Sequence, residues 1–169
     1  MVKRGLLLLL GMFLGSSLVL AEGNPVVKIG QSGEFLEFEQ NGQTIKDYLP
    51  LHRMAGVRYF SAGVGLEERS ASYPSFPLKI VFTAGGKPFL SGVAVTIQPA
   101  KGTTIVIPRD QVEGPWLFVD LDPGLYDVTA TDGGHAQHLK SIKVETGKQK
   151  VVYLRWAEDH GIAGRVPAE

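Results

Sequence analysis

The sequence predicts an all-β fold, namely a seven-stranded antiparallel β-sandwich that follows an N-terminal extension. From residue 76 to residue 157, apolar residues alternate with other residues at the period of two that places one set of side chains on one face of a strand. Segments rich in Gly, Pro and Asp separate these runs and provide turns. This region contains no helical pattern of useful length, and short strands at such spacing are typical of a sandwich.

Each predicted strand contributes one set of side chains to a single face. The sets are Leu78, Ile80 and Phe82; Val93, Val95 and Ile97; Leu117, Val119 and Leu121; Tyr126, Val128 and Ala130; Ile142 and Val144; and Val152, Leu154 and Trp156. A further short β-branched run covers residues 103–107 and ends at Pro108. We expect these sets to form the core of the domain.

The first 21 residues have the features of a cleavable signal peptide for secretion. Lys3 and Arg4 precede an apolar run from Leu6 to Leu20, which is shorter than the roughly 20 residues that span a bilayer. Ala21 stands where signal peptidase needs a small residue. The alternative is an uncleaved N-terminal anchor. Cleavage predicts a periplasmic or secreted protein without an integral membrane span.

Composition excludes several classes of function. Cleavage removes two of the 17 Lys and Arg and none of the 17 Asp and Glu, which leaves a net charge of −2. Such a charge argues against nucleic acid as the main partner. The chain has no cysteine, so disulfides, thiol nucleophiles, cysteine metal sites and lipid attachment at an N-terminal cysteine are excluded. We predict no cofactor.

Residues 22–75 are expected to form the N-terminal extension. Short strand-like stretches lie at residues 26–29 and 35–38, and Asn41-Gly42 is a strong turn signal. Residues 66–71 can form one or two helical turns. The preceding Gly-x-Gly lacks the Lys-Ser/Thr ending of a phosphate-binding loop. After the sandwich, residues 158–169 form a polar C-terminal tail.

Residues 76–156 resemble the carboxypeptidase regulatory-like domain family. The resemblance rests on the segments Gly92–Ile97 and Asp122–Ala130 and on a final hairpin from Val144 to Leu154. It implies a transthyretin-like Greek-key sandwich, in which Tyr126 buries its ring while its hydroxyl reaches a backbone group. Residues 59–82 also resemble a group of small exported bacterial proteins built on this domain. The resemblance implies no peptidase activity, since the domain is a non-catalytic appendage in those enzymes.

No catalytic or metal-binding set of residues is predicted. His135 and His138 are three residues apart, a spacing that points them to opposite faces of a strand. A two-histidine metal site or a minor hydrolase is therefore less favoured than a solvent-exposed end of a hairpin. The chain also lacks a Gly-x-Ser-x-Gly elbow.

The candidate ligand-binding residues are aromatic. Trp116 and Phe118 share the strand face opposite Leu117 and Val119, and Tyr153 is also on an outward register. Exposed aromatic rings on a sheet suit carbohydrate stacking or protein docking. The alternative is that the N-terminal extension covers Trp116 and Phe118. Tyr59, Phe60 or Phe35 would supply that cover.

These observations favour a non-catalytic binding or adaptor module that recognises a protein or a glycan of the cell envelope. The alternative is a structural accessory of an envelope assembly. Sandwich folds host many unrelated functions, so the fold alone does not decide between them.

Overall fold

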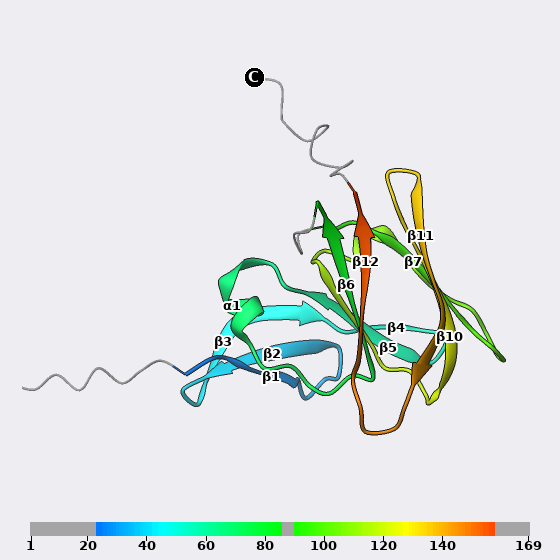
Figure 1. The fold of residues 1–169 in the computed structure, drawn as a ribbon. Coiled ribbons are helices and arrows are strands. Elements are labelled where there is room, and N and C mark those ends of the chain that lie inside the picture. Colours follow the sequence, from blue (N-terminus) through cyan, green and yellow to red (C-terminus); the bar gives the residue numbers. More distant parts are fainter. Residues whose placement is uncertain (1–22, 86–89, 158–169) are drawn as a thin grey trace, which may run out of the picture.

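The computed structural model describes residues 23–85 and 90–157, and in these residues the protein is all-β (Figure 1). One short helix, α1 (Gly65–Ser70), lies where the sequence predicts helical turns, and a 3₁₀ turn covers Arg109–Gln111. None of the helices in the described part has the length and apolar character needed to cross a membrane. The predicted signal peptide and C-terminal tail lie outside the described residues.

The strands of the described residues form three sheets. The three-stranded sheet has the order β1 (Val26–Ile29), β2 (Phe35–Gln40), β3 (Gln43–Pro50). The five-stranded sheet has the order β12 (Lys150–Trp156), β6 (Leu78–Ala84), β9 (Trp116–Val119), β5 (Val57–Ala62), β4 (His52–Met54). The four-stranded sheet has the order β11 (His135–Val144), β10 (Gly124–Asp132), β7 (Ala94–Pro99), β8 (Ile105–Ile107).

The main core lies between the four-stranded and the five-stranded sheets. It contains every residue of the six apolar sets predicted from period two, all of them buried. Tyr126 is 8% exposed, and its hydroxyl donates to the Asp122 carbonyl at 2.8 Å, which is the backbone bond expected of this residue. The alternation of apolar side chains therefore identified the inner face of these six strands correctly.

Two expectations about pairing are wrong. β12 pairs with β6 in parallel, so the sheets are not purely antiparallel. β11 and β12 do not form a hairpin, because they belong to different sheets. Both strands turn their apolar sets towards the same core from opposite sides, so the turn at residues 145–149 carries the chain across the core. A period of two defines a face of a strand but not the partner or its direction.

The five-stranded sheet contains strands from both sides of residue 75, where the sequence predicts a boundary between the N-terminal extension and the sandwich. β5 lies inside this sheet, where Phe60 is opposite Phe118, and β4 forms its edge. The sequence reading identified neither strand. Tyr59 is 1% exposed in the main core, while the next residue, Phe60, faces the opposite side of the sheet and is fully buried there.

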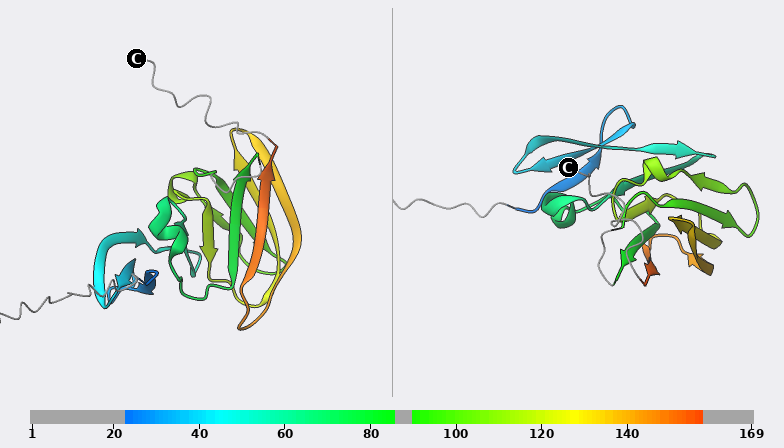
Figure 2. Two further views of the ribbon diagram at one scale, coloured as in Figure 1. Left: turned by 60° about the vertical axis from the view of Figure 1, so that its left-hand side comes forward. Right: turned by 90° about the horizontal axis from the view of Figure 1, so that it is seen from above.

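The three-stranded sheet is an antiparallel meander. The predicted turn at Asn41-Gly42 joins β2 and β3, and both residues have positive φ, 53° and 77°, as a tight hairpin turn requires. Figure 2 shows this sheet on one side of the molecule and β10 and β11 on the other. It covers the outer face of β5 and β9 and encloses a second core. That second core consists of Val27, Leu36, Phe38, Leu51, Phe60, Ala62, Phe76 and Phe118.

Candidate functional site

Two of the three aromatic candidates, Trp116 and Phe118, pack in and beside the second core. Phe118 is 2% exposed and stacks on Phe60, with ring centroids 4.5 Å apart and an interplanar angle of 7°. Trp116 is half-buried and meets Tyr73 edge to face at 6.4 Å. Of the three residues considered as cover, Phe60 fills this role, whereas Tyr59 belongs to the main core and Phe35 is 42% exposed. The two rings therefore do not form an open platform.

A cation lies over these rings and limits access further. The Lys79 ammonium is 3.6 Å from the centroid of the Trp116 ring and 5.0 Å from that of Phe118. Such a geometry stabilises the cation through the negative face of the ring. Burial lowers the pKa of Lys79. The face of the Trp116 ring is thus occupied by the Lys79 ammonium in a cation–π contact within the protein.

Tyr153 is on the outward register, as predicted, and is 50% exposed. The Arg155 guanidinium lies 5.1 Å from the centroid of its ring. Tyr153 belongs to β12, at the edge of the five-stranded sheet. Val81 of β6 stands between Tyr153 and Trp116 in the register of the sheet.

The outer face of the four-stranded sheet carries a polar site that the sequence reading missed. Cross-strand pairing places Asp127 opposite Gln98, and Thr129 opposite both Thr96 and His138. These side chains point away from the main core, because they alternate with buried residues along β7 and β10. The result is a polar row that crosses three strands.

A β-bulge shapes this face. Tyr126 pairs with Ile142 and Val128 with Leu139, so Lys140 and Ser141 together lie opposite Asp127. Ser141 has φ of 56°, in the left-handed region that non-glycine residues rarely adopt. The Asp127 carboxylate accepts a hydrogen bond from the Ser141 backbone N–H at 2.7 Å. Bulges redirect side chains and are frequent beside functional sites, and strained residues are frequent there as well.

Two neighbouring hollows follow the bulge, and we call them together the bulge groove. The larger has a volume of about 360 Å³ and the smaller about 130 Å³, and both are lined by Gln98 and Asp127. The polar side chains of the bulge groove are Thr96, Gln98, Asp127, Thr129, His138, Lys140 and Ser141. The Thr129 hydroxyl lies 3.0 Å from Nδ1 of His138, so the two side chains are within hydrogen-bonding distance across β10 and β11.

An apolar side chain borders the bulge groove. Leu125 is 50% exposed and lines both the larger hollow and a third hollow of about 590 Å³ at the end of β10 and β11. The groove thus combines hydroxyl, amide, carboxylate, imidazole and ammonium groups with one apolar contact. This combination can bind a ligand that has many hydroxyl groups, because each of these polar groups donates or accepts hydrogen bonds.

The two histidines do not come together. His138 faces the bulge groove, whereas His135 begins β11 next to the Gly133–Gly134 turn, and both are exposed. Across residues 23–85 and 90–157, no group of three or more His, Asp and Glu side chains is arranged to hold a metal ion. A sequence signal for the bulge groove existed in the alternate residues of β7 and β10. It is weak, because exposed strand faces are usually polar.

None of the family models, curated proteins or solved structures with which the chain was compared matches it.

Proposed function

We propose that the chain is a non-catalytic binding module of the cell envelope that recognises a glycan through the bulge groove. The observation that carries this proposal is the polar row of Asp127, Gln98 and Thr129, which borders two hollows beside the β-bulge. A carboxylate and an amide on adjacent strands offer several acceptors and donors to neighbouring sugar hydroxyls. Leu125 offers a contact for the apolar face of a sugar ring.

Rigidity of the scaffold supports this proposal. The groove side chains stand on strands rather than on loops, and the Asp127 to Ser141 hydrogen bond holds the bulge. A preorganised site loses less conformational entropy when a ligand binds. The predicted signal peptide supports an envelope location.

We further propose that β6 to β12 form the transthyretin-like Greek-key sandwich of the carboxypeptidase regulatory-like family. Three of these strands lie in the five-stranded sheet and four in the four-stranded sheet. The hydrogen bond from Tyr126 to Asp122 also favours this assignment. The family implies no catalysis here, and the bulge groove is compatible with a purely binding role.

A glycan array followed by calorimetry tests the function. The labelled mature protein is applied to an array that includes peptidoglycan fragments, and the strongest ligand is titrated into variants. Asp127→Asn keeps the oxygen that accepts from Ser141 but removes the charge, so affinity is expected to fall about ten- to a hundredfold. Gln98→Ala is expected to weaken binding by about two- to tenfold.

Gln43→Ala is the matched control, because it removes an exposed amide from β3 in the three-stranded sheet. Binding to this variant should equal that of the unchanged protein. The proposal would be overturned if the protein bound no glycan on the array. It would also be overturned by a ligand whose affinity is the same for Asp127→Asn, Gln98→Ala and the unchanged protein.

A further inference from the structure

A second surface, unrelated to the bulge groove, lies along β12. This strand is the terminal strand of the five-stranded sheet, and no strand in the described part of the chain pairs with its outer side. It is seven residues long and carries no proline. Proteins usually protect such an edge, because its unpaired backbone groups can pair with another strand.

The hydrogen bonds to β6 determine which backbone groups point outward. The Lys150 N–H donates to the Pro77 carbonyl at 2.7 Å, and the Trp156 carbonyl accepts from the Gly85 N–H at 3.1 Å. In a parallel ladder, alternate residues bond to the same partner strand. The even-numbered residues of β12 therefore bond to β6, and Val151, Tyr153 and Arg155 direct their N–H and C=O groups away from the sheet.

The same three residues also have exposed side chains. Val151 is 40% exposed and Tyr153 is 50% exposed, so an apolar residue and an aromatic residue stand next to the outward backbone groups. Arg155 lies against the Tyr153 ring. An added strand would gain both a backbone ladder and apolar contacts, which are the two sources of affinity in β-strand addition.

The positive charge of the β12 edge determines which kind of added strand it can bind. Lys150 and Arg155 lie on β12, and no acidic residue occurs between Glu145 and the end of this strand. Lys148 lies in the preceding turn, where it pairs with Glu145 at 3.9 Å. A second copy of this chain would bring an identical cationic edge, which opposes self-pairing. A segment with Asp or Glu between apolar residues would pair its charges with those of the edge.

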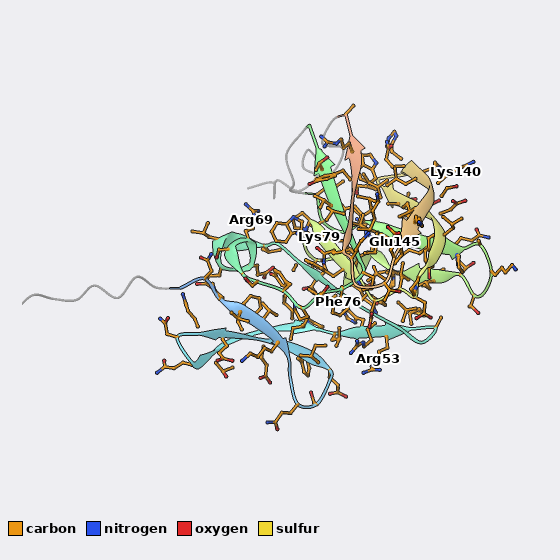
Figure 3. The ribbon with its side chains drawn as sticks, turned by 60° about the horizontal axis from the view of Figure 1, so that its bottom comes forward. Arg53, Arg69, Phe76, Lys79, Lys140 and Glu145 are labelled. Atoms are coloured by element: carbon orange, nitrogen blue, oxygen red, sulfur yellow. The ribbon has the colours of Figure 1, made fainter. Side chains whose placement is uncertain are left out.

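We infer that the outer edge of β12 accepts an extended acidic segment of a partner protein as a sixth strand of the five-stranded sheet. The site is distinct from the bulge groove, which lies on the four-stranded sheet. Figure 3 labels Lys79 on β6, next to β12, and Lys140 on β11, beside the bulge. The inference therefore does not depend on glycan binding.

Fluorescence anisotropy with a defined peptide tests the inference. The probe is a short fluorescein-labelled peptide in which Glu alternates with Val, titrated with the mature protein at low and high NaCl. We expect saturable binding that weakens as salt rises. Control peptides replace every Glu with Lys, or every second Val with Pro, and should not bind.

Tyr153→Pro is the decisive variant. Proline removes the outward N–H, and it is tolerated at an edge because this N–H takes no part in the ladder with β6. Affinity for the acidic peptide should fall by an order of magnitude or more, on the basis of one lost hydrogen bond and the lost aromatic contact. Arg155→Glu should also weaken binding, whereas Lys101→Glu, at an exposed position between β7 and β8, should leave it close to that of the unchanged protein. Circular dichroism of each variant verifies the fold.

Three results would overturn the inference. The first is no saturable binding of the acidic peptide, and the second is equal binding of the Lys peptide. The third is a homodimer, seen by sedimentation, that Tyr153→Pro converts to a monomer, since the edge would then serve a second copy of the chain. Glycan binding by the same samples separates these outcomes from failure of the proposed function.

Discussion

Truncation of Phe118 to alanine should destabilise the protein strongly, because its ring joins two sheets. It is 2% exposed and stacks on Phe60 at 4.5 Å, and Tyr73 lies 5.0 Å away on the same side of the sheet. Removal of a buried Phe costs about 3–5 kcal/mol through lost transfer energy and the cavity that remains. For a chain of this size each kcal/mol lowers Tm by about 2–4 °C, so we expect a decrease of about 6–20 °C.

Urea unfolding followed by far-UV circular dichroism and tryptophan fluorescence measures this loss. The two fluorophores are informative, since Trp116 lies beside the second core and Trp156 in the main core. Phe118→Leu retains most of the apolar volume and should lose clearly less stability than Phe118→Ala. A double-mutant cycle with Phe60→Ala should give a coupling free energy of about 0.5–1.5 kcal/mol for the stacked pair.

Phe35→Ala is the matched control, since the same truncation is made at a ring that is 42% exposed. It should cost about 1 kcal/mol or less. A loss below about 1 kcal/mol for Phe118→Ala, or a loss equal to that of Phe35→Ala, would refute the assignment of Phe118 to a packed second core.

Three further predictions concern stability, each read from urea unfolding. Gly114→Ala should lower the free energy of unfolding by several kcal/mol, because an added Cβ would lie 2.3 Å from the Ala62 carbonyl oxygen. Gly124→Ala should lower it less, because its added Cβ would lie 3.4 Å from the edge of the Tyr126 ring. Equal losses for the two would contradict the clash. Tyr126→Phe should lower the free energy of unfolding by about 1 kcal/mol, because it removes the hydrogen bond to Asp122. An unchanged urea midpoint would show that this hydrogen bond does not stabilise the fold. Burial lowers the pKa of His52 below its ordinary 6.5, although Glu113 and Asp110 act in the opposite direction. The unfolded state then binds the proton more readily than the folded state, so the free energy of unfolding should fall as the pH decreases through 6.5 towards the pKa of the folded state. This fall should be less steep in His52→Gln, and an identical pH profile in that variant would refute the prediction.

The N-terminal region shows where a reading of the sequence fails. Val57 to Ala62 was expected to belong to an extension, yet it forms an interior strand of the five-stranded sheet. Every residue of β5 from Tyr59 onward is buried, because the strand lies between two cores. A strand covered on both faces lacks apolar–polar alternation, so the period-two signal is absent where the strand is most enclosed.

The candidate site was predicted less well than the fold. The outward register of Trp116 and Phe118 was correct, and the sequence left open whether these rings are exposed or covered. Exposure depends on which other segment packs against a face, and such contacts join residues far apart in the chain. Phe60 and Phe118 are brought together by the pairing of β5 with β9. The bulge groove likewise depends on a register shift that no local pattern reveals.

The amino-acid sequence was enough to predict the all-β class, the inner face of every strand from β6 to β12 except β8, the Asn41-Gly42 turn and a backbone hydrogen bond from the Tyr126 hydroxyl. These features depend on local conformational preference and on the side-chain period of a strand. The parallel pairing of β12 with β6, the cover over Phe118 and the groove beside Asp127 became visible only in the folded structure. Each of these depends on long-range packing, because the segment that contacts a strand is far away in the chain and is not encoded in the sequence of that strand.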